Sequence, residues 1–343
     1  MEIAIERVEL RFAAGVHTSY GELGAREIVL LSLWSTDGMI GHGEAAPLEA
    51  YDGVSVDDVL AALAVYRPLL ERADELRPGD LLEACRERAD LPQALAAVDL
   101  ALWDLAGRRE ARPVCELLCD SPAKTVAVNA TITALDRAGA ASQAAAAVLA
   151  GYRCVKLKVG VGDDADRVAA VRAAIGPDVA LRLDANGAWG VEQARRTIEM
   201  LGPAGLELVE EPVHGLEATR RLREQVAVRI AIDETAAEPG ALAGGAADAV
   251  CLKIGRCGGI TGLLAAAAVV RASGAEVYVA STFDGPLGIA AGLHAAAALA
   301  PLPACGLATL DLFDPVDDRL AVRDGSIAVP GEPGLLADRT HPA

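Results

Sequence analysis

The stretch "CVKLKVG" (residues 154–160) decides the fold of this chain. Its apolar residues alternate with Lys156 and Lys158, which is the period-two pattern of a β-strand. Both ammonium groups therefore lie on one face of the strand, while the apolar side chains lie on the other. Two neighbouring cations on a strand of a largely apolar chain need partners, and the rest of the sequence supplies them.

Strand-like runs of this kind recur from about residue 126 onward, and helices rich in alanine and arginine separate most of them. Eight such runs predict an α/β fold, a (β/α)7β modified TIM barrel of parallel strands. A doubly wound open sheet is the alternative, but it usually opens with a glycine-rich phosphate loop, which we do not find. The runs are "VAVNATIT", "CVKLKVG", "VALRLDA", "LELVEEP", "VRIAIDE", "DAVCLKI", "EVYVAST" and "GLATLD".

The first part of the chain does not follow this alternation. Three antiparallel strands, in "IAIERVELRF", "REIVLLSLWSTDG" and "MIGHGEAAPL", are followed by a group of helices. This pattern predicts an N-terminal α+β capping domain over residues 1–120 and a barrel domain over residues 121–313. We expect the tail, residues 314–343, to return across the cap and complete it.

Composition limits the function. The chain has 343 residues, 52% of them apolar, and a formal net charge of −18. A nucleic acid or an anionic membrane would require a basic face, so neither is expected as a partner. The charged N-terminus "MEIAIERVELRF" lacks the apolar run of a secretory signal, and cytoplasmic localisation is expected. The seven cysteines show no metal-binding spacing and are expected to be free thiols, and a homo-oligomer is compatible with the sequence.

Carboxylates end three successive barrel runs. Asp184, Glu210 and Asp233 stand at the carboxyl ends of their strands, and in a parallel barrel these ends meet on one face. One such acid alone could be an ordinary loop residue, but three together would repel one another without a cation. Oxygen ligands suit a hard ion, so the pattern predicts Mg²⁺, with Mn²⁺ as a substitute.

Lysines flank these acids on both sides. Lys156 and Lys158 precede the strand of Asp184, and Lys253 follows the strand of Asp233. Burial and the neighbouring Lys156 are expected to lower the pKa of Lys158, as a base working near neutral pH requires. The alternative is that the lysines are only counter-ions of the acids.

Removal of a proton next to a carboxylate is the chemistry that suits this set. The product is an enediolate, whose negative charge a metal ion can stabilise. Three further polar residues, adjacent to or near the proposed ligands, are expected to support the site by hydrogen bonds rather than to bind the metal. These residues are Asn186, Glu211 and Glu234.

The motifs resemble those of the enolase superfamily, and specifically of its muconate-lactonizing subgroup, over nearly the whole chain. "GHGEAAPL" and "AAVDLALWDLAGR" resemble segments of the capping domain, and "VKLKVG", "LDANGAW", "VEEP", "IDE" and "LKIGRCGG" resemble the active-site strand ends in order. The resemblance implies that Lys158 and Lys253 are acid/base lysines on opposite faces of a small carboxylate substrate. It also implies that the three acids bind Mg²⁺.

Within that subgroup, residues 280–309 resemble the last two units of bacterial o-succinylbenzoate synthases. Those enzymes dehydrate 2-succinyl-6-hydroxy-2,4-cyclohexadiene-1-carboxylate in menaquinone biosynthesis. The resemblance implies that Lys158 transfers the proton and that Lys253 stabilises charge. Substrate contacts are expected from two cap loops, residues 13–22 and 48–53, and from the last strand ends. The expected contacts are Tyr20, Tyr51, Ser281, Thr282 and Gly306.

Other activities of the subgroup stay open, namely those of a cycloisomerase, an epimerase or a racemase. Dipeptide epimerases resemble the sequence too, but they carry an Asp-x-Asp pair on the eighth strand, whereas Asp311 and Asp314 here stand three apart. An N-acylamino acid racemase would have the same lysines and acids. A barrel that binds metal and ligand without catalysis is a further alternative, against which the intact lysine pair argues.

Overall fold

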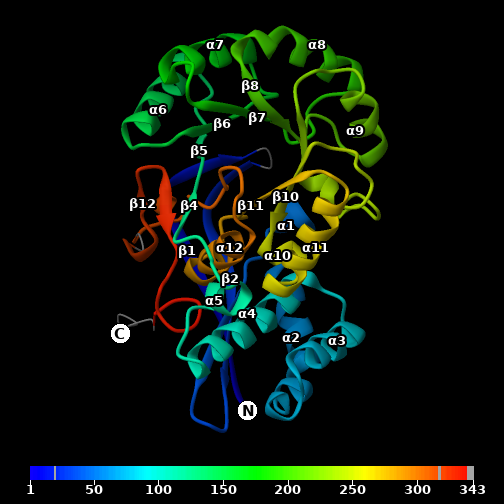
Figure 1. Cartoon of the computed structure of the whole chain (residues 1–343), viewed down its shortest axis with the longest axis vertical. Coiled ribbons are helices and arrows are strands. Elements are labelled where there is room, and N and C mark those ends of the chain that lie inside the picture. The colour runs from blue at the N-terminus through cyan, green and yellow to red at the C-terminus, as the bar shows by residue number, and fades with distance from the viewer. Residues whose placement is uncertain (19–20, 316–317, 338–343) are drawn as a thin grey trace.

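The computed structural model of the chain describes residues 1–18, 21–315 and 318–337. Figure 1 shows two parts, with the N-terminal strands and helices at the bottom and a curled parallel sheet with its helices above. We call the part that holds β1 to β3 and α1 to α5 the cap, and the part with the parallel sheet the barrel. No helix in the described ranges has the length and apolar character that crossing a membrane would need.

The barrel sheet contains seven parallel strands within the described ranges, in the order β11-β10-β9-β8-β7-β6-β5. Each strand thus lies beside its neighbour in sequence, as the alternation of strands and helices predicted. The strands are β5 (Ala130–Ile132), β6 (Cys154–Lys158), β7 (Ala180–Asp184), β8 (Leu206–Glu210), β9 (Ile230–Ile232), β10 (Ala249–Lys253) and β11 (Glu276–Ala280). The helices are α6 (Arg137–Leu149), α7 (Asp164–Ile175), α8 (Val191–Leu201), α9 (Leu216–Arg223), α10 (Ile254–Cys257), α11 (Ile260–Ala272) and α12 (Pro286–Leu299).

The eighth run, "GLATLD", does not form a regular strand. The barrel is closed by two isolated bridges: Cys305, which directly precedes the run, bridges to Val128, and Gly306 bridges to Ala280. The chain then turns away into the short 3-10 helix η4 (Leu310–Leu312). After η4, Phe313 stacks on Phe12 of the cap, with ring centroids 4.6 Å apart. The strand preference of the run is therefore not realised in this tertiary setting.

The first predicted run, "VAVNATIT", is split between two sheets. Its second half is β5, but its first half, β4 (Thr125–Ala127), pairs with the C-terminal tail. The tail forms β12 (Val322–Arg323) and β13 (Ser326–Ala328), and β13 is antiparallel to β4. The tail also reaches the cap, where the amide of Leu335 donates to Asp104 at 2.7 Å.

The cap is an antiparallel sheet, in the order β1-β2-β3, covered by helices. Its strands and helices follow the predicted order. The strands are β1 (Glu2–Thr18), β2 (Gly21–Trp34) and β3 (Ile40–Ala45). The helices are α1 (Glu49–Asp52), α2 (Val56–Leu70), α3 (Pro78–Arg88), α4 (Pro92–Arg109) and α5 (Val114–Leu118).

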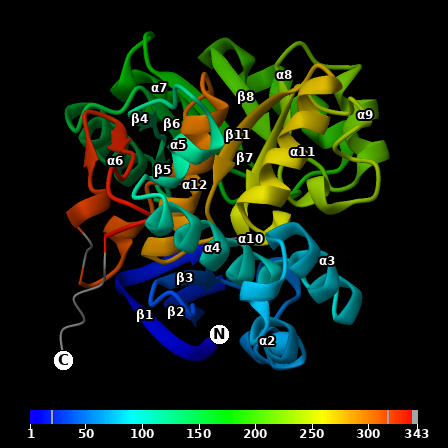
Figure 2. The same ribbon diagram turned by 60° about the horizontal axis from the view of Figure 1, so that its bottom comes forward.

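Two glycines let α4 lie directly against the cap sheet. A Cβ atom on Gly43 would stand 1.9 Å from the carbonyl oxygen of Ala97, and one on Gly41 would stand 2.2 Å from that of Ala101. Only glycine permits this approach, so "GHGEA" reads as a strand that packs on a helix backbone. Figure 2 shows the cap sheet and α4 beneath the barrel.

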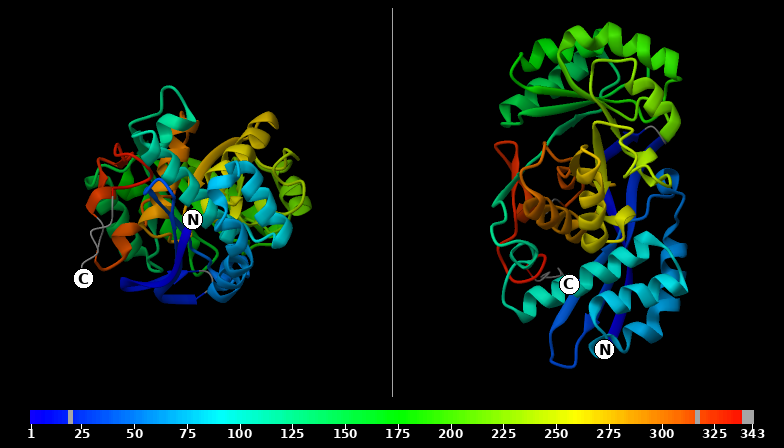
Figure 3. Two further views of the ribbon diagram at one scale, coloured as in Figure 1. Left: turned by 90° about the horizontal axis from the view of Figure 1, so that it is seen from below. Right: turned by 45° about the vertical axis from the view of Figure 1, so that its right-hand side comes forward.

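The cap also extends toward the carboxyl ends of the barrel strands. The long hairpin of β1 and β2 runs from the cap alongside the barrel (Figure 3). Residues 13–16 of this hairpin, with Leu48 and Tyr51 of the next cap segment, line the same cavity as the barrel strand ends. The prediction that these two segments are loops is wrong, since residues 13–16 belong to strand β1 and Tyr51 to helix α1. Both segments nevertheless lie where a substrate lid would have to lie.

Candidate active site

Parallel pairing brings the predicted lysines and acids together. In the sheet, Lys158 pairs with Asp184, and Asp184 pairs with Glu210 on the next strand. Asp233 follows β9 directly, and Lys253 ends β10. All of them line one cavity of about 670 Å³, so the predicted convergence of strand ends is found in the structure.

The two lysines of β6 bind different acids. Nζ of Lys156 lies 2.9 Å from Asp184 Oδ2 and 2.9 Å from Glu210 Oε1, so it bridges two carboxylates. Nζ of Lys158 donates to Asp184 Oδ2 and to Asn186 Oδ1, both at 2.7 Å. Lys156 thus lies among the acids, whereas Lys158 lies farther along the strand and is the more exposed of the two.

Lys253 approaches from the opposite wall, because three strands separate β10 from β6. Its Nζ donates to Asp233 Oδ2 at 2.6 Å and to the Tyr51 hydroxyl at 2.7 Å. Tyr51 in turn donates to Asp233 Oδ1 at 2.7 Å and accepts from Arg256 at 2.6 Å. The predicted substrate contact Tyr51 is therefore bound to the site's own charged groups.

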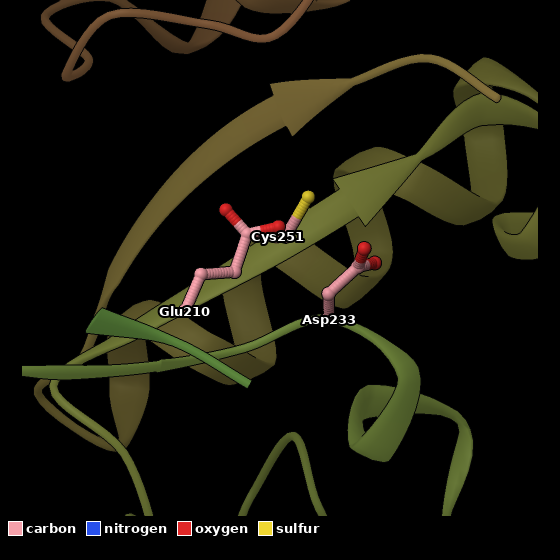
Figure 4. Close-up of side chains that lie close together, drawn as sticks. All are labelled: Glu210, Asp233 and Cys251. Atoms are coloured by element: carbon pink, nitrogen blue, oxygen red, sulfur yellow. The ribbon is translucent and has the colours of Figure 1, made fainter. Parts of the chain in front are cut away.

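Candidate metal ligands lie close together on neighbouring strands. Within the described residues, potential ligand atoms of Glu210, Asp233 and Cys251 all lie within 4.8 Å of one another. Figure 4 shows these three side chains close together, with Glu210 and Cys251 on strands β8 and β10 and Asp233 directly after β9. Asp184 is not in this group, and it is joined to Glu210 through the shared ammonium of Lys156. The ligand set of three acids remains a prediction.

The pKa values of the two acids Glu210 and Asp184 are shifted in opposite directions. Burial raises the pKa of Glu210, and the negative charges of Asp184 and Asp233 add to this despite the nearby Lys156. Burial also opposes ionisation of Asp184, but Lys156 and Lys158 outweigh it and lower the pKa. At Glu210, the ammonium of Lys156 therefore does not outweigh burial and the two neighbouring carboxylates.

The pKa values of Lys156 and Lys253 are both raised by the carboxylates beside them. Burial lowers the pKa of Lys156, but the adjacent Asp184 and Glu210 outweigh burial and raise it. At Lys253, burial is outweighed in the same way by Asp233, and the pKa is raised. Each of these two ammonium groups lies less than 3 Å from a buried carboxylate. The lowered pKa expected for Lys158 stays a prediction.

The expected supporting residues make hydrogen bonds to the site. Glu211 accepts from the backbone amide of Asp233 at 2.8 Å and from that of Thr235 at 3.1 Å, which fixes the end of β9. Asn186 links Lys158 to Glu234, since its Nδ2 donates to Glu234 at 3.0 Å. Asn186 and Glu211 both have positive φ angles, 44° and 42°, directly after or near the predicted ligands. Such left-handed backbone at non-glycine residues is typical of functional sites.

The remaining predicted contacts lie on the cavity wall, with one exception. Ser281, Thr282 and Gly306 line the cavity. The Ser281 hydroxyl pairs with that of Thr309 at 2.9 Å, and the Thr282 hydroxyl donates to Asp284 at 2.8 Å. Tyr20 lies outside the described residues.

Sequence reasoning missed three residues of this region. Arg256 binds Tyr51, and Phe283 lines the cavity with a positive φ of 58°. Tyr278 donates its hydroxyl hydrogen to Glu210 Oε2 at 2.9 Å from within the barrel. The available signal for Tyr278 was a polar ring inside the buried run "EVYVAST", where a hydroxyl needs a partner.

Family comparisons agree with this geometry. Residues 1–119 match the model for the mandelate racemase / muconate lactonizing enzyme N-terminal domain, and residues 139–338 match the model for the enolase C-terminal domain-like family. The chain belongs to the enolase superfamily. Within the superfamily it falls in the muconate-lactonizing subgroup that the motifs had indicated.

The relatives of this chain differ in activity. The chain is 39% identical to o-succinylbenzoate synthase of Thermobifida fusca over 219 residues, covering 60% of this chain and 67% of the relative. It is 29% identical to the hydrophobic dipeptide epimerase of Enterococcus faecalis, covering 81% of each. The crystal structure of the Enterococcus faecalis V583 dipeptide epimerase with Mg and L-Leu-L-Tyr has a TM-score of 0.88 at 25% identity, covering 97% of this chain and 98% of that one. These relatives include a lyase and epimerases, so the superfamily is shown and the reaction class is not.

Proposed function

We propose that the chain is a Mg²⁺-dependent enzyme that removes the proton α to a substrate carboxylate and passes through an enediolate. The observation that carries this proposal is the set of buried acids held between Lys158 and Lys253 in one cavity. Lysines on opposing walls can reach both faces of a bound carbon acid, which a purely structural charge cluster would not require.

Mg²⁺ fits the residues present. Asp184, Glu210 and Asp233 offer oxygen atoms, the ligands that hard cations prefer. Burial raises the pKa of the Cys251 thiol well above its ordinary value, which disfavours a thiolate ligand and a soft metal. The raised pKa of Glu210 also supports a site with room for further positive charge. Mn²⁺, with similar ligand preferences, is the proposed substitute.

Mg²⁺, when bound, would supply electrostatic stabilisation for the negative charge that develops on the substrate carboxylate oxygens. Lys158 is the proposed base, because it is the more exposed lysine of β6 and is oriented by Asp184 and Asn186. Lys253 is held by Asp233 and Tyr51 on the other wall. Its ammonium would stabilise the anionic intermediate from the face opposite Lys158.

Dehydration of 2-succinyl-6-hydroxy-2,4-cyclohexadiene-1-carboxylate is the proposed reaction. Lys158 would take the C1 proton and then return it to the hydroxyl leaving C6, so that water departs from one face and the ring becomes aromatic. The 39% identity to an o-succinylbenzoate synthase supports this reaction. The lining of the cavity also supports it: Asp311 lies there, but Asp314 is not among the lining residues, so the acid pair of dipeptide epimerases is incomplete.

Epimerisation of a dipeptide or racemisation of an N-acylamino acid is the second candidate. It is favoured by the two lysines on opposing walls, which is the arrangement for removing a proton on one face and returning it on the other. In that reaction Lys158 and Lys253 would each serve as base for one stereoisomer.

A direct assay tests these reactions. The purified chain with Mg²⁺ is incubated with the cyclohexadiene acid, and separately with dipeptides and N-succinylamino acids in deuterated water. Aromatic absorbance is expected for the first, and α-deuteration would support the second candidate. Failure of every substrate to react or exchange its α-proton would overturn the proposal.

Variants of the two lysines separate the candidates. Lys158→Ala is expected to abolish dehydration while Mg²⁺ still binds. Lys253→Arg retains a cation without a usable base, so it should keep part of a dehydration activity but block epimerisation from one stereoisomer. A Lys158→Ala variant as active as wild type would end the proposed role of Lys158.

A further inference from the structure

Tyr278 lies directly beneath the predicted metal ligand Glu210, inside the barrel. It belongs to β11, is 2% exposed, and pairs with Cys251 of β10. Its hydroxyl donates to Oε2 of Glu210 at 2.9 Å. No substrate could reach this hydroxyl directly, because Tyr278 does not line the cavity that holds the lysines.

The ring of Tyr278 is fixed by a buried arginine. The guanidinium carbon of Arg182 lies 5.1 Å from the ring centroid, in a cation–π contact. Arg182 is itself held by Glu207 at 2.6 Å and by the carbonyl oxygen of Ala304 at 2.6 Å. The phenol is therefore positioned from below by a group that cannot move freely.

The two carboxylate oxygens of Glu210 accept different numbers of hydrogen bonds, so they differ in the lone pairs left for a metal ion. Oε2 accepts from Tyr278 at 2.9 Å and from Lys156 at 3.1 Å, whereas Oε1 accepts from Lys156 alone at 2.9 Å. A carboxylate oxygen has about two lone-pair sites, so Oε2 has none left and Oε1 has one. Only Oε1 is free to bind a metal ion.

We propose that Tyr278 is a positioning residue that restricts Glu210 to one-oxygen coordination and so selects Mg²⁺ against Ca²⁺. Mg²⁺ requires compact octahedral coordination, whereas Ca²⁺ takes more ligands and readily binds both oxygens of a carboxylate. The inference rests on the proposed metal site, and it adds a reason for the ion's identity that the acids alone do not give.

Tyr278→Phe isolates the hydroxyl, because the ring and its contact with Arg182 are retained. Isothermal titration calorimetry of the purified whole chain with MgCl₂ and with CaCl₂ measures the two dissociation constants. We expect the Kd for Mg²⁺ to rise about tenfold, as on loss of other hydrogen bonds to metal ligands. We expect the Kd for Ca²⁺ to change less or to fall, so that the preference for Mg²⁺ narrows.

Tyr66→Phe is the matched control. Tyr66 is equally buried, and its hydroxyl donates to the carbonyl of Ala89 in the cap, away from the acids. Its removal should alter thermal stability but neither Kd. The inference is overturned if Tyr278→Phe binds both ions like wild type, or if both affinities fall by the same factor. Wild-type protein that binds no Mg²⁺ would instead overturn the proposed function, and this inference with it.

Discussion

The hydroxyl of Tyr51, on helix α1 of the cap, lies 2.7 Å from Oδ1 of Asp233 at the end of a barrel strand. The hydroxyl oxygen of Tyr51 also accepts hydrogen bonds from Lys253 and from Arg256. Its ring lies under both cations, with Nζ of Lys253 4.2 Å from the centroid. The cap therefore contributes to the charged site itself and does more than cover it.

Tyr51→Phe removes this hydroxyl and keeps the ring. Hydrogen bonds to charged groups contribute about 1.5–3 kcal/mol each, so we expect kcat/KM to fall by about 10- to 100-fold. The fall has a physical reason: Asp233 and Lys253 each lose a partner that holds them in place. Steady-state kinetics with the substrate found in the assays would measure it.

The same Tyr66→Phe variant is the control, since it loses one buried hydroxyl bond elsewhere in the cap. Its kcat/KM should match wild type. A Tyr51→Phe enzyme within twofold of wild type would show that the contact with Asp233 is not needed for turnover.

The sequence could predict the strand ends of this site but not their partners. Period-two alternation places Lys158, Asp184 and Glu210 on strands, and parallel order makes them converge. Tyr51 and Asp233 are 182 positions apart, and no local pattern links a cap residue to a particular carboxylate. The hydrogen bond between Tyr278 and Glu210 could not be predicted for the same reason, since the two residues are 68 positions apart.

The misjudged parts of the fold and site depend on tertiary contacts. "GLATLD" has the composition of a strand, yet the chain enters the 3-10 helix η4 there, and Phe313 beyond it stacks on Phe12 of the cap. The raised pKa of Lys156 could not be predicted, because a sequence shows that Lys156 has a cationic neighbour but not that two buried acids touch it. Local propensity and alternation thus gave the element order, while packing decided where elements end.

Removal of the metal is a second test of the site. Chelation with EDTA should abolish activity, and Mg²⁺ should restore it, with Mn²⁺ restoring a part. Asp184→Asn removes one negative charge next to Lys156 and Lys158, so we expect the affinity for Mg²⁺ to fall at least tenfold. Titration calorimetry measures this affinity.

Asp178→Asn is the control for that change, because Asp178 is an exposed acid outside the cavity. It should bind Mg²⁺ like wild type. Full activity after exhaustive chelation would contradict the proposed role of the metal.

The packing of α4 on the cap sheet gives a third prediction. Gly43→Ala would place a Cβ 1.9 Å from the carbonyl of Ala97, so strand and helix must separate. Overpacking of this kind costs about 1–3 kcal/mol, and we expect the free energy of unfolding to fall by that amount. Gly79→Ala is the matched control, since nothing lies within 4 Å of its Cβ position. Urea denaturation of both variants would detect the difference, and an unchanged Gly43→Ala would contradict the close packing.

We expect the acid stability of the fold to depend on a histidine at the junction of the barrel, the cap and the tail. His294 of α12 accepts from the amide of Cys115 at 3.1 Å through Nδ1, and its Nε2 donates to the carbonyl of Leu335 at 2.8 Å. Burial lowers its pKa from 6.5 to about 4, since the charged imidazolium would lose its hydration. The folded state thus binds fewer protons than the unfolded state between these values. The contribution of His294 to the free energy of unfolding is therefore present above pH 6.5 and is lost as the pH falls toward 4. The total loss is about 3 kcal/mol.

Asp99 of α4 has the opposite effect on the pH dependence of stability. It accepts from the backbone amide of Thr261 in α11 at 3.0 Å, and burial raises its pKa to about 6. Here the folded state binds more protons, so the contribution of Asp99 is greatest below its ordinary pKa of 3.8 and is lost as pH rises through 6. Between pH 7 and pH 4, His294→Gln should therefore flatten the loss of unfolding free energy, and Asp99→Asn should steepen it. Urea denaturation at intervals across this range measures both slopes, and equal slopes in wild type and His294→Gln would show that the histidine is not held neutral.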